Sequence, residues 1–324
     1  MEQFFYSLEA YLKTKIRRST FLKIILGGFT YYISNSAFLK MAFAKTAISE
    51  GRKKREVTAD YDLVLAEGPD PYANMVNAVN KMGDMDRFVK KGDIVVVKPN
   101  MAWDRSVEQG ANTDPMVVSA LVEMAYKAGA KQVKVFDAPC NDEKRCHENT
   151  GIAKAAAESG AKVSFVNHWD VVKCKFPYKS PMEGWPVFRE AVDCDVFINA
   201  PVLKHHRLTT LTLAMKNLMG ICSGTRGMIH IDIGGKLVDI TDFIKPDLNV
   251  IDGTRYLQRN GPSGGNLEDV VRLDKVIVST DATLADTFAA DLVKVDPNEL
   301  PNLKAAYERG FGITDISKAR IAKI

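Results

Sequence analysis

The chain has 324 residues, of which 46% are hydrophobic and 26% charged, so it can bury one large core or two modest ones. This composition excludes a disordered chain, a collagen-like repeat and a small disulfide scaffold. The formal net charge of +4 comes from residues 1–44, and the bases and acids of the remaining chain balance. A general nucleic-acid binder is therefore not expected.

Residues 1–44 are predicted to be an export signal. Arg17-Arg18 stands before Phe21, a moderately apolar run covers residues 24–39, and Ala-Phe-Ala ends the segment. This order resembles a twin-arginine signal, although two residues rather than one separate the arginine pair from the phenylalanine. The resemblance implies a bacterial-type periplasmic or otherwise exported protein that meets a membrane only through this segment. An N-terminal amphipathic or anchoring helix is the alternative.

The start of the mature chain and the cysteines give weaker signals. Residues 45–60 contain the charged run 52–55 and are expected to be a solvated, flexible segment. The five cysteines include no CxxC pair, so their spacing indicates neither a ferredoxin-like cluster nor a structural zinc site. Cys140 and Cys146 are close enough in sequence to bridge a short loop, while burial as a small apolar side chain is expected for each cysteine by itself.

From residue 61 onward, short β-rich runs alternate with helical patterns. Most of the β-rich runs are continuously apolar, as strands covered on both faces should be. The predicted strands are 61–66, 93–98, 132–137, 162–167, 195–200, 248–252, 275–279 and 318–323.

The clearest predicted helix opens at Thr113-Asp114-Pro115, a cap followed by proline at the first helical position, and stops at Gly129. Further helices are expected after residue 151, near 186, and over about 209–221 and about 281–292. The alternation predicts an α/β fold: a mostly parallel, doubly wound sheet with helices on both faces, in a single main domain over 61–324. A subdomain at about 170–190 or about 223–270 is compatible with the pattern.

Polar side chains follow six of the predicted strands, and they are expected to build one site. In an open parallel sheet, ligands bind outside the carboxyl ends of the strands. The residues at these ends are Lys98 and Asn100, Asp137, Asn167 and His168, Lys204 to His206, Asp252, and Asp281.

Four strings carry a family resemblance: VVVKPN (95–100), NTDPMVVSALVEMAYKAGAKQVKVFDAP (112–139), FINAPVLKHHRLTTLTLAMKNLMG (197–220) and DLNVIDGTRYLQRNGPSGG (247–265). Over about residues 62–295 the chain resembles domain of unknown function family 362. The resemblance implies the fold and the place of the site more than a reaction. Many members of that family carry an appended iron-sulfur ferredoxin module, whose cysteine pattern this chain lacks.

The predicted ligand-binding residues are those suited to hold an anion. An ammonium group at a strand end suits a carboxylate or a phosphate. Two further residues stand in the third family string, and the lysine of that pair projects away from the apolar face of the predicted 209–221 helix. The predicted set is Lys98, Asn100, Asp137, Lys204, Lys216 and Asn217.

The predicted catalytic residues are His205, His206 and Asp252. A histidine can transfer protons near neutral pH. Adjacent residues of an extended segment point to opposite faces, so only one of the two histidines should enter the site. Asp252 or Asp137 would orient that histidine or hold a metal.

A metal site is a second possibility for the same region, because neutral imidazole binds metals. The candidate ligands are His205, His230 and Asp232, the last two lying on one side if their segment is a strand. A plain hairpin is the other interpretation of that segment, and the glycines of residues 220–235 suit a lid over the site.

These observations predict an exported enzyme that binds a small anionic metabolite. Redox or metal-assisted chemistry is the leading expectation, with a metal ion or an iron-sulfur cluster as candidate cofactor and a redox protein as candidate partner. The alternative is a non-catalytic module that binds a ligand or metal and delivers it to a periplasmic partner. No Walker or HExxH motif occurs, which disfavours nucleotide-binding and zincin functions.

Overall fold

The computed structural model describes residues 46–324, so the predicted export signal lies outside the described residues. The main sheet is built from β2 (Leu63–Glu67), β3 (Ile94–Pro99), β4 (Gln132–Val135), β5 (Lys162–Val163), β8 (Val196–Ala200), β9 (Val202–His206), β10 (Thr210–Thr212), β11 (Leu248–Leu257), β12 (Val270–Ser279) and β13 (Ile321–Lys323). Its order is β13-β2-β12-β11-β8-β3-β4-β5, with β9 beside β11 and β10 beside β9. A smaller sheet joins β1 (Ala47–Ser49), β6 (Val171–Cys174) and β7 (Pro186–Phe188), in the stretch where a subdomain was compatible with the sequence.

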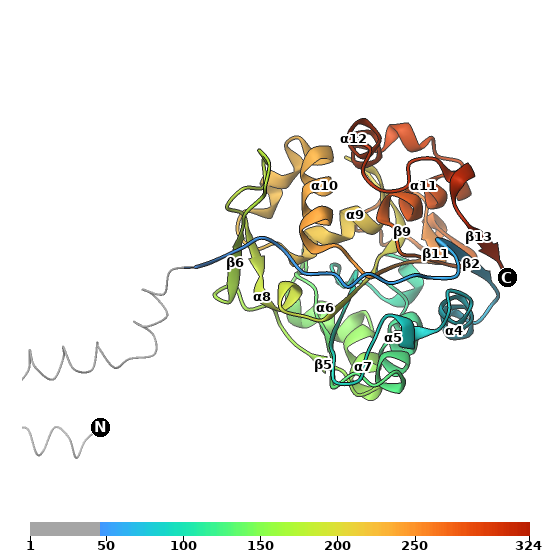
Figure 1. The fold of residues 1–324 in the computed structure, drawn as a ribbon. Helices are drawn as coiled ribbons and strands as arrows, with labels where there is room; N and C mark the ends of the chain where they lie inside the picture. Colours follow the sequence, from blue (N-terminus) through green and yellow to red (C-terminus); the bar gives the residue numbers. More distant parts are fainter. Residues whose placement is uncertain (1–45) are drawn as a thin grey trace, which may run out of the picture. The chain divides into compact units, whose positions relative to one another are not determined.

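Helices cover both faces of the main sheet (Figure 1). One layer contains α4 (Pro71–Lys81), α5 (Pro115–Lys127) and α7 (Ile152–Glu158), and the other contains α9 (Ala214–Asn217), α10 (Ile233–Ile244), α11 (Ala282–Leu292) and α12 (Pro301–Arg309). The short helices α6 (Glu143–Asn149) and α8 (Arg189–Val192) lie in connections.

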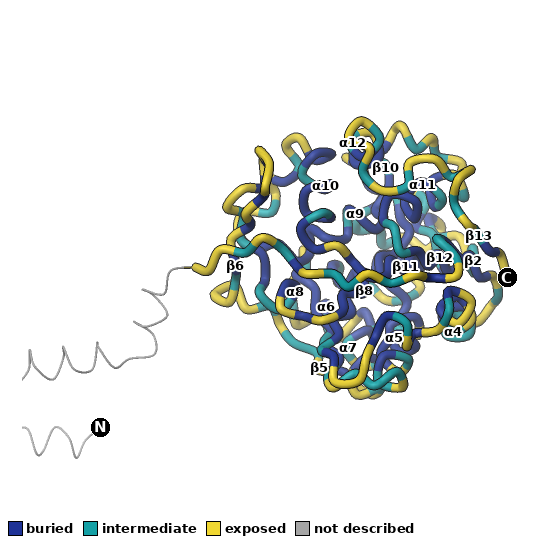
Figure 2. The backbone as a smooth tube through the Cα atoms, viewed as in Figure 1, coloured by how far each residue is buried: buried dark blue, intermediate teal, exposed yellow. Residues whose placement is uncertain are grey.

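The alternation of side chains along the central strands divides the core in two. Val95 and Val97 of β3 pack into the core shared with α4, α5 and α7, whereas Val96 packs into the core shared with α9 to α12. Figure 2 shows β8 and β11 buried between the two layers. The predicted class, a mostly parallel and doubly wound α/β fold with one main domain, is confirmed.

Each of the eight predicted strands overlaps an observed one, but β12 runs in the opposite direction to its neighbours. It pairs antiparallel with both β11 and β2, and Ser279 at its end lies opposite Asn249 at the start of β11. Asp281 therefore lies at the amino edge of the parallel strands, where it caps α11 by accepting a hydrogen bond from Leu284 N at 2.8 Å. Its predicted place at the carboxyl edge is wrong.

Three local predictions also differ from the structure. The helix expected over 209–221 begins as a strand, because residues 210–212 pair antiparallel with β9, and helical turns start only at Ala214. The helix expected near 186 is β7 followed by α8. The segment 220–235 is neither a hairpin nor an open loop, since it contains a short 3-10 helix, Arg226–His230, and the start of α10.

The described part of residues 45–60 packs against the domain, in contrast to the expected solvated segment. β1 pairs in parallel with β6. The Arg52 side chain is buried, forms an ion pair with Asp247 at 2.6 Å and donates hydrogen bonds to the carbonyl oxygens of Ile244 and Asp195. Within residues 46–324, no helix has the length and apolar character needed to cross a membrane.

Candidate functional site

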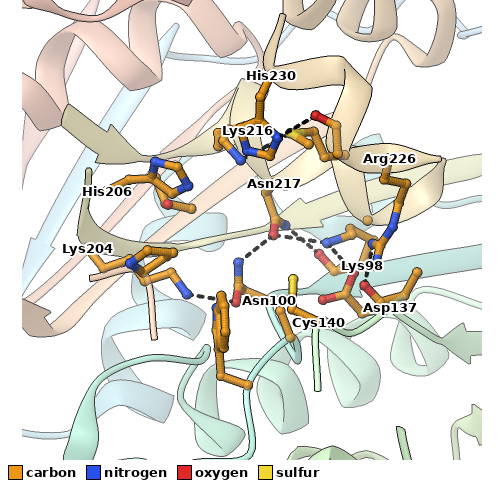
Figure 3. A pocket seen from close by; sticks show the side chains of 18 residues that line it. Lys98, Asn100, Asp137, Cys140, Lys204, His206, Lys216, Asn217, Arg226 and His230 are labelled. Atoms are coloured by element: carbon orange, nitrogen blue, oxygen red, sulfur yellow. Dashed lines mark hydrogen bonds and ion pairs between the residues drawn. The ribbon is translucent and has the colours of Figure 1, made fainter. Parts of the chain in front are cut away.

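A cavity of about 390 Å³ lies at the carboxyl ends of β3 and β4, where residues of β9 and α9 also reach it (Figure 3). All six predicted ligand-binding residues line it, together with two histidines. These residues are Lys98, Asn100, Asp137, Lys204, Lys216 and Asn217, with His206 and His230. Stretches of chain that are distant in sequence thus meet at one edge of the sheet, as expected for this fold.

Lys98 and Asp137 form a buried ion pair at the base of the cavity. Both side chains are about 1% exposed, and Lys98 Nζ lies 2.7 Å from Asp137 Oδ1. The second carboxylate oxygen accepts a hydrogen bond from Met101 N at 2.8 Å. Burial lowers the pKa of Lys98, and the Asp137 carboxylate opposes this shift. This lysine already has its counter-ion.

Asn217 connects the ion pair to the neighbouring lysine. Its Oδ1 accepts hydrogen bonds from Lys98 Nζ at 2.9 Å and from Asn100 Nδ2 at 3.1 Å, and its Nδ2 donates to Asn199 Oδ1 at 2.9 Å. Asn100 in turn accepts a hydrogen bond from Lys204 Nζ at 3.2 Å. The amides of Asn100, just after β3, and Asn217, at the end of α9, therefore fix both lysines.

Lys204 is a buried lysine without a carboxylate partner. It is 1% exposed, and besides Asn100 its Nζ donates to the carbonyl oxygen of Ala111. Among residues 46–324, it forms no ion pair. Burial lowers the pKa of Lys204 to about 7, and the positive charges of Lys216 and Lys98 act in the same direction.

Two more cations of the wall lack a counter-ion in the described part of the chain. Lys216 Nζ contacts Met219 Sδ at 3.1 Å, and burial lowers its pKa to about 8. Arg226 donates to the carbonyl oxygens of Ala138 and Pro139 at 2.6 and 2.7 Å. Three cations thus face a cavity whose one carboxylate, that of Asp137, is already paired, and this arrangement favours an anionic ligand.

His206 and His230 stack on the same side of the cavity, with ring centroids 6.0 Å apart. His206 Nδ1 accepts a hydrogen bond from Leu208 N at 3.1 Å, so the proton of the neutral ring lies on Nε2. His230 Nδ1 lies 3.2 Å from the carbonyl oxygen of Gly227, so its proton lies on Nδ1 and its Nε2 is free to accept. Burial lowers the pKa of His206 to about 3, with Lys216 and His230 adding to the shift.

Asn167, His168 and Asp281, which were expected at the same sheet edge, do not line this cavity, and neither do three of the predicted catalytic or metal-binding residues. His205 alternates with His206 along β9 and faces away, where its buried Nδ1 has no hydrogen-bond partner in the described structure. Asp252 accepts from the backbone N–H groups of Asp114 and Thr254 at 2.7 and 2.9 Å, and burial raises its pKa to about 6. Asp232 has a left-handed backbone at the start of α10.

The predicted metal ligands His205, His230 and Asp232 therefore do not meet. Within residues 46–324, no group of three His, Cys, Asp or Glu side chains is arranged to hold a metal ion. The donor set of the cavity also does not fit one, because its ammonium and guanidinium groups repel a divalent cation and offer it no lone pair while charged.

Four polar or aromatic residues of the wall escaped prediction: Arg226, Cys140, Trp103 and Thr212. Cys140 stands three positions after Asp137, so its place just beyond the polar end of the predicted 132–137 strand could have indicated it as a site residue. Trp103 lies with its ring centroid 5.9 Å from Lys204 Nζ. Arg226 had no signal beyond its place in a glycine-rich stretch, because the 3-10 helix that places it is set by tertiary contacts.

Comparison with known proteins supports the family resemblance. Residues 95–291 match the family described as "Domain of unknown function (DUF362)", and this range contains every residue of the cavity named above. The chain belongs to this family. A relative by sequence, the thylakoid-associated protein sll1697 of Synechocystis sp., is 29% identical over 256 residues, which are 75% of this chain and 76% of the relative.

Two solved structures are similar at a lower level. The lactate racemase apoprotein from Thermoanaerobacterium thermosaccharolyticum gives a TM-score of 0.45 at 10% identity, over 77% of this chain and 62% of that chain. A protein from Thermotoga maritima gives a TM-score of 0.32 at 13% identity, over 61% and 54% of the two chains. This DUF362 protein thus spans less than two thirds of the length of either structure.

Proposed function

We propose that this protein is an enzyme that binds a small organic anion in the cavity and transfers protons to or from it. The carboxylate or phosphate of the ligand would lie between Lys216 and Arg226. The observation that carries this proposal is that three cations of one wall, these two and Lys204, have no counter-ion among the described residues.

The cost of burying these charges supports the proposal. A buried ammonium without a counter-ion loses hydration and recovers little of it, so its charged form is disfavoured. This is the reason why burial lowers the pKa values of Lys204 and Lys216 to about 7 and about 8. A bound anion replaces the lost hydration, and the free energy regained contributes to its affinity.

The groups around the proposed anion also suit acid-base chemistry. An acid or base works best when its pKa lies near the working pH. Lys204 and Lys216 meet this condition, and the neutral His206 ring presents an N–H at Nε2. In this proposal the lysines exchange protons with the ligand, and His206 donates a hydrogen bond to it.

Isothermal titration of the protein with sulfate tests the binding step. The variant Lys216→Met removes one cation, and we expect its affinity for sulfate to fall at least about tenfold, or 1.4 kcal/mol. The matched control is Lys154→Met, which removes an exposed lysine that reaches only Glu158. Equal affinity in the wild type and Lys216→Met, with both proteins folded, would contradict the proposal.

We also propose that the chain is exported, on the basis of the residue order in 1–44. Replacing Arg17 and Arg18 by lysine keeps the charge but removes the arginine pair. We expect the substituted protein to stay in the cytoplasmic fraction of a bacterial host while the wild type reaches the periplasmic fraction. Identical distribution of the two proteins would show that the pair is not an export determinant.

A further inference from the structure

Besides its charge, the cavity has a second feature: the pairing of β9 with β10 places the buried hydroxyl group of Thr212 beside Lys204. Resting on the proposed function, we propose that Lys204 forms a covalent imine with a small 2-oxo carboxylate, assisted by the hydroxyl group of Thr212. The ligand class follows from two requirements: a carbonyl group that reaches Lys204, and an adjacent carboxylate for the cations of Lys216 and Arg226.

The hydrogen bonds of Lys204 suit a neutral amine. Its Nζ donates to two oxygens, Asn100 Oδ1 at 3.2 Å and the carbonyl oxygen of Ala111. A neutral amine has two N–H bonds and one lone pair, so these two acceptors use both hydrogens. The lone pair is left for a carbonyl carbon in the cavity that this side chain lines.

Burial favours the neutral form of Lys204, whereas the charges that face it act in both directions. Lys216 of α9 and Lys98 of β3 disfavour its charge, whereas Cys140 and Asp137 favour it, and the effect of burial exceeds all four. His206 of β9 is neutral and adds no charge. A lysine that is desolvated and placed beside other cations is activated as a nucleophile near neutral pH.

Thr212 supplies a hydroxyl group at the point where the carbonyl oxygen would lie. It is the direct cross-strand partner of Lys204 in the β9–β10 pair, so both side chains stand on the same face of the sheet. It lines the cavity, is 3% exposed, and its Oγ1 has no hydrogen-bond partner in the described structure. Native proteins rarely bury such a group without a partner, and a ligand oxygen would provide one.

The reaction needs no further reagent. The Lys204 lone pair attacks the carbonyl carbon, a C–N bond forms, and the C=O π electrons move to the oxygen, which the Thr212 hydroxyl stabilises. The tetrahedral adduct then loses that oxygen as water together with both amine hydrogens, and the nitrogen lone pair forms the C=N bond.

Reductive trapping tests the inference on the full chain. The protein is incubated with pyruvate and sodium borohydride at neutral pH, and its mass and peptide map are measured. We expect a mass gain of one pyruvate less one oxygen atom, located on Lys204. Because an exposed lysine is almost entirely charged at this pH, labelling of Lys204 should exceed that of the exposed Lys154 by on the order of a hundredfold.

Two variants provide controls. Lys204→Arg removes the nucleophilic amine and should abolish the label, and Thr212→Val keeps the shape of the side chain and should slow labelling at least about fivefold. In the wild type, saturating sulfate should protect Lys204 from labelling by pyruvate, and this test needs no variant.

The outcomes separate the two proposals. Sulfate binding without labelling of Lys204, or with equal labelling of exposed lysines, would overturn the imine and leave the anion site standing. Absence of sulfate and pyruvate binding in the folded wild type would overturn both.

Discussion

At the scale of single residues, the buried ion pair of the cavity depends on a glycine. A Cβ atom added to Gly220 would lie 1.9 Å from Asp137 Oδ1 and 2.6 Å from Lys98 Nζ, so one or both of these side chains would have to move. The closeness has a local cause, since the Gly220 carbonyl oxygen accepts a hydrogen bond from Ala138 N at 3.1 Å and holds the two segments together.

Gly220→Ala should therefore break the Lys98–Asp137 pair. Leaving a buried charge without its partner costs about 3–5 kcal/mol, and we expect the free energy of unfolding in urea to fall by roughly 3 kcal/mol. Gly227→Ala is the matched control, because Gly227 lines the same cavity and no atom lies within 4 Å of the position of its added Cβ. Equal stability of the two variants would show that the pair tolerates displacement.

The sequence predicted the lysines, amides and carboxylate of the cavity better than its histidines. Lys98 and Asp137 directly follow buried strands, and strand ends meet at one edge whatever the details of the loops. The choice between His205 and His206 depends on the register of a hairpin, and a shift of one residue exchanges their faces. The sequence pattern of residues 202–212 does not specify that register, because it favours a helix from about residue 209 over the strand that pairs with β9.

At the scale of elements, the segment before β2 packs against the domain and connects several of its helices and strands. Arg52 holds Asp247 and the carbonyl oxygens of Ile244 and Asp195, and so connects the end of α10 with the starts of β8 and β11. The charged run at 52–55 predicted the opposite, because a run of charges is usually solvated. Arg52 is an exception because the buried carboxylate of Asp247 needs a counter-ion. Burial raises the pKa of Asp247, and the charge of Arg52 opposes this shift.

Arg52→Met should destabilise the domain by about 3 kcal/mol at pH 7, measured by urea unfolding. Without the guanidinium, the pKa of Asp247 in the folded state rises further above its value in the unfolded chain. The loss of stability should thus grow as the pH rises from about 4 to 7, since only the unfolded state then ionises freely. Lys53→Met, on the exposed neighbouring residue, should leave stability within about 0.5 kcal/mol of the wild type.

The direction of β12 marks the limit of prediction at this scale. Its apolar run identified a strand, and the helix that follows it, α11, was predicted with nearly correct bounds. A run that is buried on both faces has no feature that distinguishes parallel from antiparallel pairing. The connection gave no signal either, because the predicted strands 248–252 and 275–279 leave residues 253–274 between them, which is long enough for a parallel crossover.

At the scale of the whole molecule, the chain beyond residue 44 carries equal numbers of acids and bases, yet it gathers cations without counter-ions in one cavity. The net charge predicts no general nucleic-acid binding, and it gives no sign of this local excess. The fold creates it by bringing β3, β9 and α9 to one edge of the sheet. Our account rests on the claim that this excess exists to bind an anion.

Proton uptake on binding tests this claim most directly. Sulfate does not titrate near pH 8, and a bound dianion must raise the pKa values of Lys204 and Lys216 from about 7 and about 8. Titration calorimetry at pH 8 in two buffers of different ionisation enthalpy should give an uptake of about one proton per bound sulfate. Sulfate binding without proton uptake, or no binding, would contradict the account.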